Sequence, residues 1–392
     1  MAYHTAMTVS SLKPPWIRAK APAGETWKRV AEVLQAYDLH TVCDEAQCPN
    51  KGVCWGAGTA TFMILGNICT RTCRFCGVSS GLHGQDIRPD EGEAIAQGAR
   101  ELGLTYLVLT SVDRDDLPDR GAGHFGACVK AVKQGIPGIV AEVLVPDYTE
   151  PELALFAESM PEVLAHNLET VRSLQGVRDR RASFDKSLAT LKAAKALGVK
   201  ATKSSLLLGF GEKKEELLTA MDELREADVD ILVIGQYLQP SKRQIPVTEY
   251  VSPEQFEDYF QAGIRRGFGA VIAAPFARTS YHAFEAFNEW KKKAGMIQIE
   301  GLGKPEGCKL IRLKAVIEKG LITAIQIWGD FFASPEEEFD RIASRLTGLV
   351  PEEIADRFDR LVQEAGIEVF GISGTGVASV LQDALKTSKE RL

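Results

Sequence analysis

Three things that the sequence lacks restrict the class of protein. No stretch approaches the roughly 18 consecutive apolar residues that a membrane-spanning helix needs, so no membrane partner is expected. The charge balance is 46 basic against 53 acidic residues, a net charge of −7, and it lacks the basic excess typical of nucleic-acid binders. The first twelve residues contain neither Lys nor Arg and no apolar segment. We therefore expect no secretory or transit signal and a cytoplasmic location.

The middle of the chain alternates strand-like and helix-like segments. Apolar, strand-like runs recur over 61–65, 105–110, 139–145, 163–165, 201–208 and 230–237, with 270–274 as a possible extra. Amphipathic segments over 184–197, 213–227 and 253–266 lie between them. This alternation favours an α/β fold with a parallel sheet and helices outside, although periodicity alone does not distinguish a partial (β/α)6 barrel from an open doubly wound sheet.

The pattern changes after a run of three lysines, Lys291 to Lys293. Residues 309–318 and 321–328 alternate between apolar and polar side chains around a Lys319-Gly320 turn, which predicts an antiparallel hairpin. Ser334, followed by Pro335 and then Glu337, predicts a capped helix, and further helices are expected from about 351 and over 375–389. We therefore expect a small α+β domain over 293–392, after a barrel over 61–292 and an N-terminal extension over 1–60.

Cysteines supply the strongest chemical signal. A disulfide framework is typical of short secreted chains, whereas clustered cysteines in a long chain without an export signal favour metal binding. Cys69-x3-Cys73-x2-Cys76 follows the first predicted strand, at the strand end where α/β enzymes place active sites. Three thiolates at this spacing can hold a [4Fe–4S] cluster with one open iron, and that iron can chelate S-adenosylmethionine for reductive cleavage. Zinc fits less well, because it prefers closed sets of four ligands.

A second set, Cys43-x4-Cys48-x5-Cys54, precedes the first. It also offers three thiolates, so a metal centre there needs an outside ligand or an open site, and a zinc knuckle stays possible on these residues alone. Cys128 and Cys308 lack partners at ligand spacing, and we expect both to be ordinary buried cysteines.

Other side chains are candidates because of where they fall in the pattern. Phe75, beside the last cysteine, could line an adenine pocket, and Asn167 and Glu169 lie just past a strand end, where they could hold S-adenosylmethionine together with Ser111 and Arg178. We further predict that His166 is a core histidine bonded to backbone and that Gly209-Phe210-Gly211 is a strand-to-helix turn. The sequence assigns no role to Lys203 or Arg120.

The chain resembles the lipoyl synthase family of radical S-adenosylmethionine (radical SAM) enzymes. The matching segments are HTVCDEAQCPNKGVCW (40–55), TATFMILGNICTRTCRFCGV (59–78), TSVDRDDLPDRGAGHF (110–125), AHNLETV (165–171), TKSSLLLGFGE (202–212), IGQYLQPS (234–241) and ARTSYHA (277–283). The resemblance runs from about residue 13 to 287. Thr279 stands where the family usually has serine, and Arg120 stands where glycine is common.

The resemblance implies two [4Fe–4S] clusters with different tasks. Cys69, Cys73 and Cys76 match the ligands of the cluster that binds S-adenosylmethionine. Cys43, Cys48 and Cys54 match those of an auxiliary cluster, whose fourth iron is bound by the serine before the tyrosine, here Ser280. The implied reaction inserts two sulfur atoms at C6 and C8 of an octanoyl chain attached to a lipoyl carrier domain, with the auxiliary cluster as sulfur donor and two S-adenosylmethionine molecules consumed.

Residues 307–348 resemble the accessory C-terminal domain of lipoate–protein ligases, with a GDFF turn at 329–332. The resemblance implies as partners an octanoylated lipoyl carrier domain or glycine-cleavage H protein, a ferredoxin or flavodoxin as electron donor, and a separate ligase subunit. Two alternatives remain at this point. One is another sulfur-inserting or methylthio-transferring radical SAM enzyme, and the other is an iron–sulfur electron carrier or zinc-stabilised binding protein.

Overall fold

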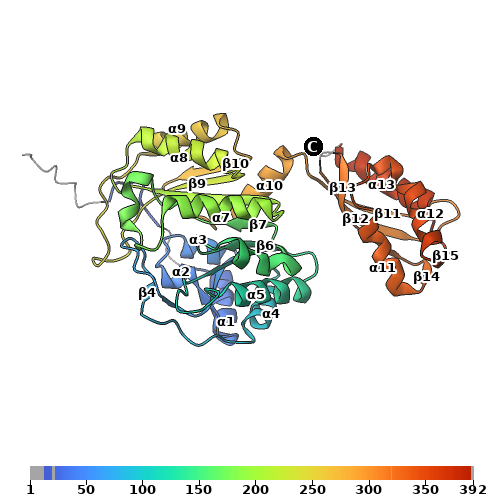
Figure 1. The fold of residues 1–392 in the computed structure, drawn as a ribbon, viewed down its shortest axis with the longest axis horizontal. Helices are drawn as coiled ribbons and strands as arrows, with labels where there is room; N and C mark the ends of the chain where they lie inside the picture. Colours follow the sequence, from blue (N-terminus) through green and yellow to red (C-terminus); the bar gives the residue numbers. More distant parts are fainter. Residues whose placement is uncertain (1–12, 20–22, 319, 390–392) are drawn as a thin grey trace, which may run out of the picture. The chain divides into compact units, whose positions relative to one another are not determined.

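The computed structural model describes residues 13–19, 23–318 and 320–389, and it divides into two compact units, Met1–Phe287 and Asn288–Leu392 (Figure 1). The first twelve residues, for which no signal is expected, and Lys319 of the predicted turn lie outside the described residues. Among the helices of the described ranges, none is both long and apolar enough to cross a bilayer.

The first unit is built on one eight-stranded sheet. Its strands, in sheet order, are β1 (His40–Thr41), β2 (Thr61–Ile64), β5 (Tyr106–Ser111), β6 (Val140–Leu144), β7 (Val163–Ala165), β8 (Ala201–Leu208), β9 (Ile231–Gln236) and β10 (Ala270–Ala274). All neighbours from β2 to β10 pair in parallel, and β1 pairs antiparallel with β2. The six predicted strands and the possible seventh are confirmed. The sheet stays open, because β1 and β10 end the order, as expected of a partial barrel.

Helices connect these strands in the expected βα pattern. They are α1 (Glu25–Ala36), α2 (Val42–Glu45), α3 (Lys51–Gly56), α4 (Glu91–Glu101), α5 (Ala122–Gly135), α6 (Glu150–Leu153), α7 (Phe184–Ala196), α8 (Lys214–Glu226), α9 (Pro253–Arg265) and α10 (Ala283–Lys293), with 3-10 turns at Ala154–Ser159 and Arg172–Val177. The α9 helix begins with a capping box between Ser252 and Gln255. In α8 the predicted apolar face of Leu217, Met221 and Leu224 is buried.

Most strands of this sheet are buried along almost their whole length because helices and loops cover them. All six residues of β9 are buried, as parallel strands with two covered faces require. One buried ion pair interrupts the apolar interior: Lys203 Nζ on β8 donates to both oxygens of Glu142 on β6, at 2.9 and 3.1 Å, and neither side chain is exposed. Tyr106 donates its hydroxyl to Glu142 as well, at 2.5 Å. The role of Lys203, open from the sequence, is therefore to neutralise an interior carboxylate.

The second unit is a small α+β fold. A three-stranded antiparallel sheet contains β11 (Ile297–Gly303), β12 (Ile311–Glu318) and β13 (Leu321–Gly329), and a second pair contains β14 (Phe332–Ser334) and β15 (Glu368–Phe370). The helices are α11 (Glu336–Arg345), α12 (Ile354–Glu364) and α13 (Gly374–Lys389), with a 3-10 turn at Pro351–Glu353. The hairpin and the two later helices are as predicted, whereas β11 was not predicted.

The capping box predicted at Ser334 is wrong. Ser334 is the last residue of β14 and pairs with Glu368 of β15, so its backbone belongs to a strand. Pro335 occupies the N-cap position of α11, and no side-chain cap is formed. The tertiary pairing of β14 with a strand 34 residues later overrides the local capping pattern.

Candidate functional site

The Cys69–Cys76 segment leaves the sheet through a sharp turn after β2. Leu65 and Gly66 both have positive φ, 67° and 82°, and the backbone N–H of Leu65 donates to Glu91 at 3.1 Å. The segment then forms β3 (Ile68–Cys69), which pairs with β4 (Ser79–Ser80). The turn therefore places the cysteines at the carboxyl end of the parallel sheet, where the sequence predicted them.

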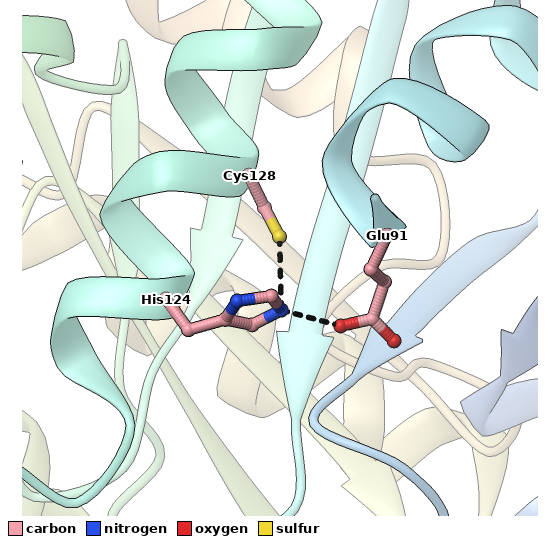
Figure 2. A group of neighbouring side chains, drawn as sticks. All are labelled: Glu91, His124 and Cys128. Atoms are coloured by element: carbon pink, nitrogen blue, oxygen red, sulfur yellow. Dashed lines mark hydrogen bonds and ion pairs between the residues drawn. The ribbon is translucent and has the colours of Figure 1, made fainter. Parts of the chain in front are cut away.

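Glu91 belongs to a buried group with His124 and Cys128 (Figure 2). His124 Nε2 lies 2.7 Å from the Glu91 carboxylate, and Cys128 Sγ lies 3.5 Å from the same nitrogen. Cys128 is buried, as predicted. The structure also places Glu91 and His124 beside it at ligand spacing, which the sequence did not reveal because Glu91 comes from a separate helix. Because one Glu91 oxygen serves both His124 and the Leu65 backbone, the group fixes the turn that leads into the cysteine segment.

Cys69, Cys73 and Cys76 line one cavity of about 250 Å³. Their sulfurs are free and receive backbone hydrogen bonds: Arg71 donates to Cys69 Sγ at 3.4 Å, and Asp179 donates to Cys73 Sγ at 3.2 Å. The five residues predicted to hold S-adenosylmethionine line the same cavity, namely Phe75, Ser111, Asn167, Glu169 and Arg178. That they contact the cofactor stays a prediction.

The polar side chains that line this cavity differ in whether they have hydrogen-bond partners. Ser111 Oγ is buried without a hydrogen-bond partner among the described residues. The Arg178 guanidinium, in contrast, is held by Ser187 at 2.9 Å and Gln175 at 3.0 Å. His166 lies behind it as the predicted core histidine, with Nδ1 2.8 Å from the Val145 carbonyl.

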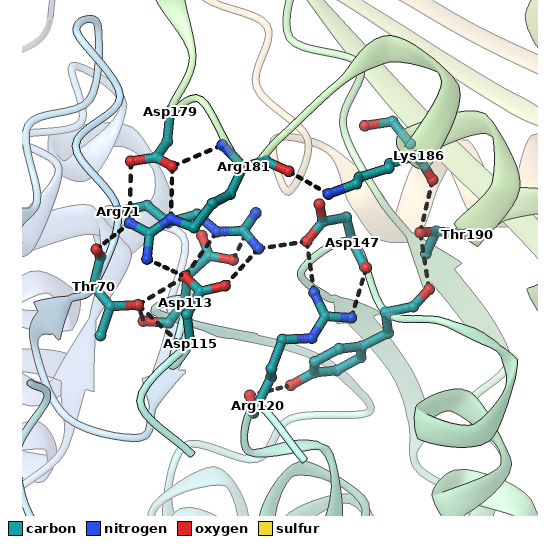
Figure 3. Close-up of polar contacts among 12 residues, drawn as sticks. Thr70, Arg71, Asp113, Asp115, Arg120, Asp147, Asp179, Arg181, Lys186 and Thr190 are labelled. Carbon is teal, nitrogen blue, oxygen red and sulfur yellow. Dashed lines mark hydrogen bonds and ion pairs between the residues drawn. The ribbon is translucent and has the colours of Figure 1, made fainter. Parts of the chain in front are cut away.

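Sequence reasoning missed a charged network that includes Arg71, which lies between Cys69 and Cys73 in the sequence (Figure 3). Arg71, within the cysteine motif itself, forms ion pairs with Asp113 at 3.2 Å, Asp115 at 2.9 Å and Asp147 at 2.7 Å. Asp147 also binds Arg120 at 2.9 Å, which gives Arg120 a role. The arginine anchors the cysteine segment to the loops that follow β5 and β6. The acidic cluster in the sequence SVDRDD was the available signal, but its partner lies more than 40 residues away.

Burial sets the electrostatics of this network. Burial, partly opposed by the charge of Arg71, raises the pKa of Asp113 to about 6. Burial also acts to raise the pKa of Asp115, but its hydrogen bonds to Arg71 outweigh this and hold that pKa below the ordinary value. Asp113 therefore takes up a proton at a higher pH than an ordinary aspartate, whereas its neighbour Asp115 stays ionised there.

The second cysteine set lies on short helices around β1. Cys43 is in α2, Cys54 is in α3, and Cys48 lies in the connection between them. Together they line a cavity of about 200 Å³ whose lining also includes Ser280, the predicted fourth ligand. The structure thus brings together four residues that span most of the first unit.

The Ser280 loop, residues 275–282 between β10 and α10, is fixed in place from two sides. Asn50 donates its side-chain amide to the Phe276 carbonyl at 2.6 Å, which ties the loop to the Cys48–Cys54 segment. Gly235 of β9 makes the second contact, because a Cβ on it would lie 2.1 Å from the Ala277 carbonyl oxygen. Only glycine permits this approach of the loop to the sheet.

The donor sets fit iron–sulfur clusters. Burial raises the pKa of Cys43 and Cys76 to about 11 and that of Cys54, Cys69 and Cys73 to about 12, so these thiols are protonated at neutral pH in the absence of metal. Binding a metal cation favours the thiolate form of these cysteines, so metal loading releases their protons. Three clustered thiols match the ligand set of a cluster with an open iron, and three thiols with a hydroxyl match a closed one.

The two cavities share a wall. Six residues line both of them: Val42, Phe75, Cys76, Leu144, Asn167 and Glu169. The two cavities are therefore direct neighbours. Two thiol sets placed in this way can serve successive steps on one substrate.

Cys308, in the second unit, does not match its prediction. It is only half-buried, and its Sγ lies 3.5 Å from the Ser373 hydroxyl. A short turn after β11 leaves it at the edge of the apolar core rather than inside it.

Comparison with known proteins bears on the whole first unit. Residues 63–224 match the radical SAM superfamily, and residues 7–48 match the N-terminal domain of lipoyl synthase of the radical SAM family. The chain is 50% identical over 276 residues to a lipoyl synthase of Halorhodospira halophila, covering 69% of this chain and 82% of that one. It is also 50% identical over 285 residues to a lipoyl synthase of Pyrobaculum calidifontis, covering 71% and 98%.

Among solved structures, one similar chain belongs to a bipartite lipoate–protein ligase system of Thermoplasma acidophilum, at 27% identity and a TM-score of 0.19 over 22% of this chain and 93% of that one. The same family is indicated by the two cysteine sets, by the parallel sheet and by relatives that match over most of their own length. The chain belongs to the lipoyl synthase family, whose members are radical SAM enzymes that insert sulfur.

Proposed function

We propose that the chain inserts two sulfur atoms at C6 and C8 of a protein-bound octanoyl chain, and that an auxiliary [4Fe–4S] cluster held by Cys43, Cys48, Cys54 and Ser280 supplies the sulfur. The observation that carries this proposal is that all four side chains line one cavity, which shares a wall with the cavity of Cys69, Cys73 and Cys76. Family membership supports the reaction, and the shared wall supports the route from one cluster to the other.

In the first cavity, Cys69, Cys73 and Cys76 would hold the cluster that binds S-adenosylmethionine. When bound, the cluster and S-adenosylmethionine supply a 5′-deoxyadenosyl radical, which can remove hydrogen from an unactivated carbon. Protein acids and bases cannot do this, since their pKa values stay within several units of the reference values. Ser111, Asn167, Glu169 and Arg178 would orient the cofactor, and Phe75 would line the adenine.

The chain's own residues prepare the path of the substrate. Val42, Phe75 and Leu144 are apolar members of the shared wall, and they suit an acyl chain lying between the two sites. Arg71 and its aspartates hold the cysteine segment rigid, so that the distance between the sites is fixed by the fold.

Ser280 would differ from the three cysteines as a ligand. Its oxygen is harder than a thiolate and is a weaker partner for iron, so this corner of the auxiliary cluster would detach most readily. A detachable corner suits a cluster that is consumed as a sulfur source. The Ser280 loop supplies the oxygen from a well-anchored backbone, so detachment involves the side chain rather than the loop.

We further assign residues 1–60, 61–292 and 293–392 to the cluster-binding extension, the partial barrel and a domain similar to a ligase accessory domain. The last would dock the octanoylated lipoyl carrier domain or H protein, or a separate ligase subunit. A ferredoxin or flavodoxin would supply electrons. The support for the last domain is the resemblance of residues 307–348, and it predicts no catalytic group there.

Two measurements on the full chain test the function. After anaerobic reconstitution, iron and sulfide analysis should give about eight iron atoms per chain, the content of two cubane clusters. Mass spectrometry of an octanoylated carrier peptide should then show the gain of two sulfur atoms with the loss of two hydrogens. About four irons per chain, or a product carrying a methylthio group, would contradict the proposal.

A further inference from the structure

A hydrogen-bonded chain crosses the wall between the two cavities. Thr279, the residue before Ser280, donates its hydroxyl to Asn167 Oδ1 at 2.9 Å. Asn167 in turn donates Nδ2 to Glu169 Oε1 at 3.1 Å. Thr279 lines only the second cavity, whereas Asn167 and Glu169 line both. The chain therefore begins at the predicted auxiliary ligand and ends beside the predicted cofactor.

The direction of this chain is fixed by chemistry. If the Asn167 amide were reversed, its oxygen would face the Glu169 carboxylate, and two acceptors would oppose each other. With the observed orientation, the amide NH2 satisfies Glu169 and the amide oxygen needs a donor, which the Thr279 hydroxyl provides. Glu169 therefore selects the orientation of the amide, and the Thr279 hydroxyl holds the amide in place by donating to its oxygen.

The far end of the chain is rigid. Glu169 has a positive φ of 67°, and its backbone is bonded to β8 on both sides, from its N–H to Ser205 at 3.1 Å and from Leu207 N–H to its carbonyl at 2.8 Å. Thr279 itself is 7% exposed. A change in the Thr279 side chain therefore acts on the Asn167 side chain, because the backbone of Glu169 is held in place.

We propose that Thr279 is a positioning residue that links the Ser280 loop to the S-adenosylmethionine cavity by orienting the Asn167 amide for cofactor binding. This rests on the proposed function for the assignment of S-adenosylmethionine to the first cavity. By linkage, any change at the Ser280 loop that breaks the bond changes cofactor affinity, and cofactor binding acts on the loop by the same factor. The two cluster sites are then coupled through side chains of this chain.

The test compares Thr279→Val with Thr279→Ser in the full chain, reconstituted anaerobically. Valine keeps the shape and loses the donor, while serine keeps the donor. The readout is the dissociation constant of S-adenosylmethionine, measured by equilibrium dialysis without reductant so that no turnover occurs. We expect the constant to rise about fivefold in the valine variant, as loss of a hydrogen bond of about 1 kcal/mol predicts, and to stay within about twofold in the serine variant. Iron content should remain at about eight per chain in both.

A double-mutant cycle separates positioning from a general structural effect. In an Asn167→Ala background, Thr279→Val should change the dissociation constant by less than about twofold, because the residue acts through that amide. Should the valine variant lose iron, Thr279→Ala replaces it in both backgrounds, since alanine also removes the donor and adds no bulk.

The outcomes of the test are distinct. Wild-type chain that contains about eight irons and binds S-adenosylmethionine, with a valine variant that binds equally well, overturns the coupling and leaves the proposed function intact. If Thr279→Val raises the dissociation constant as much in the Asn167→Ala background as in wild type, the coupling is overturned as well. A wild-type chain that binds no S-adenosylmethionine contradicts the proposed function, and the coupling falls with it.

Discussion

At the scale of single residues, the second cavity brings one hydroxyl oxygen together with three cysteine sulfurs. Cys43, Cys48 and Cys54 come from one short stretch, and Ser280 reaches the same cavity from the loop after β10. Thiolates bind iron firmly, whereas an alcohol oxygen at the fourth corner binds less firmly. Under the proposed function, the identity of this one atom would govern how easily the auxiliary cluster can be taken apart.

Replacing that oxygen by sulfur tests this idea. In a Ser280→Cys variant, we expect both clusters to assemble, at about eight irons per chain, while sulfur transfer falls at least tenfold because the fourth corner no longer detaches. Iron analysis and product mass spectrometry measure the two effects. Ser280→Ala is the contrasting variant, and it should assemble the auxiliary cluster poorly. Full sulfur transfer by the cysteine variant would show that the serine oxygen is not needed for release.

His166 gives the first unit a dependence on pH. Burial first, and the charge of Arg178 second, lower its pKa from the ordinary value of 6.5 to about 4. Between these values the unfolded chain takes up a proton that the folded chain does not, so the free energy of unfolding decreases as the pH falls from 6.5 toward 4. The contribution is fully present above pH 6.5.

The corresponding measurement compares wild type with His166→Gln. Urea unfolding at pH 7, 6 and 5 should show that the stability advantage of wild type over the variant shrinks by up to about 2 kcal/mol between pH 7 and pH 5. Glutamine does not titrate in this range, so it removes the proton uptake and keeps a polar side chain. Parallel stability curves for the two proteins would rule out His166 as the source.

At the scale of secondary structure elements, β9 and the Ser280 loop are so close that glycine is required. Gly235→Ala places a methyl group on the Ala277 carbonyl and should displace the loop. We expect iron content to fall from about eight to about four per chain, because only the auxiliary site depends on this loop. Gly176→Ala is the matched control, since a Cβ there meets nothing within 4 Å. Retention of about eight irons by Gly235→Ala would show that the loop adjusts without losing its ligand.

Secondary structure elements and site residues differ in how well the sequence predicts them. The parallel strands were predictable because buried strands form apolar runs, and the Cys69–Cys76 set because its ligands are close in sequence. Ser280 was reached only through resemblance, since nothing local marks a serine as a ligand. β11 was missed because Gly301 and Gly303 suggest a loop, whereas in the fold they admit the side chain of Val380 from α13.

The charged network shows a second limit of sequence reasoning. Arg71 binds three aspartates from loops that follow two different strands, and no spacing rule connects them. In sequence they look like solvated surface charges. Only the parallel sheet, which collects the carboxyl ends of its strands at one edge, brings them together.

At the scale of the whole molecule, the chain has two units, and the chemistry described above is confined to the first. A chain shortened to residues 1–293 keeps all of α10 and tests the task of the second unit. We expect iron content of about eight per chain and unchanged turnover of a short octanoyl-lysine peptide. The KM for an octanoylated carrier protein should rise about tenfold, the loss of about 1.4 kcal/mol of docking energy.

Steady-state kinetics with the two substrates measure this split. The short peptide is the internal control, because it contacts the catalytic unit alone. Equal KM values of the shortened and full chains for the carrier protein would assign the second unit a task other than docking the carrier, such as holding a ligase subunit.

The bond from Asn50 to Phe276 joins residues 226 positions apart. During synthesis, the first three proposed auxiliary ligands leave the ribosome long before the loop that carries the proposed fourth, and the other cysteine triad follows the first three closely. An auxiliary cluster delivered to the nascent chain would meet an unfinished cage. Under the proposed function, the auxiliary site is therefore complete only after the sheet has formed through β10, its last strand along the chain.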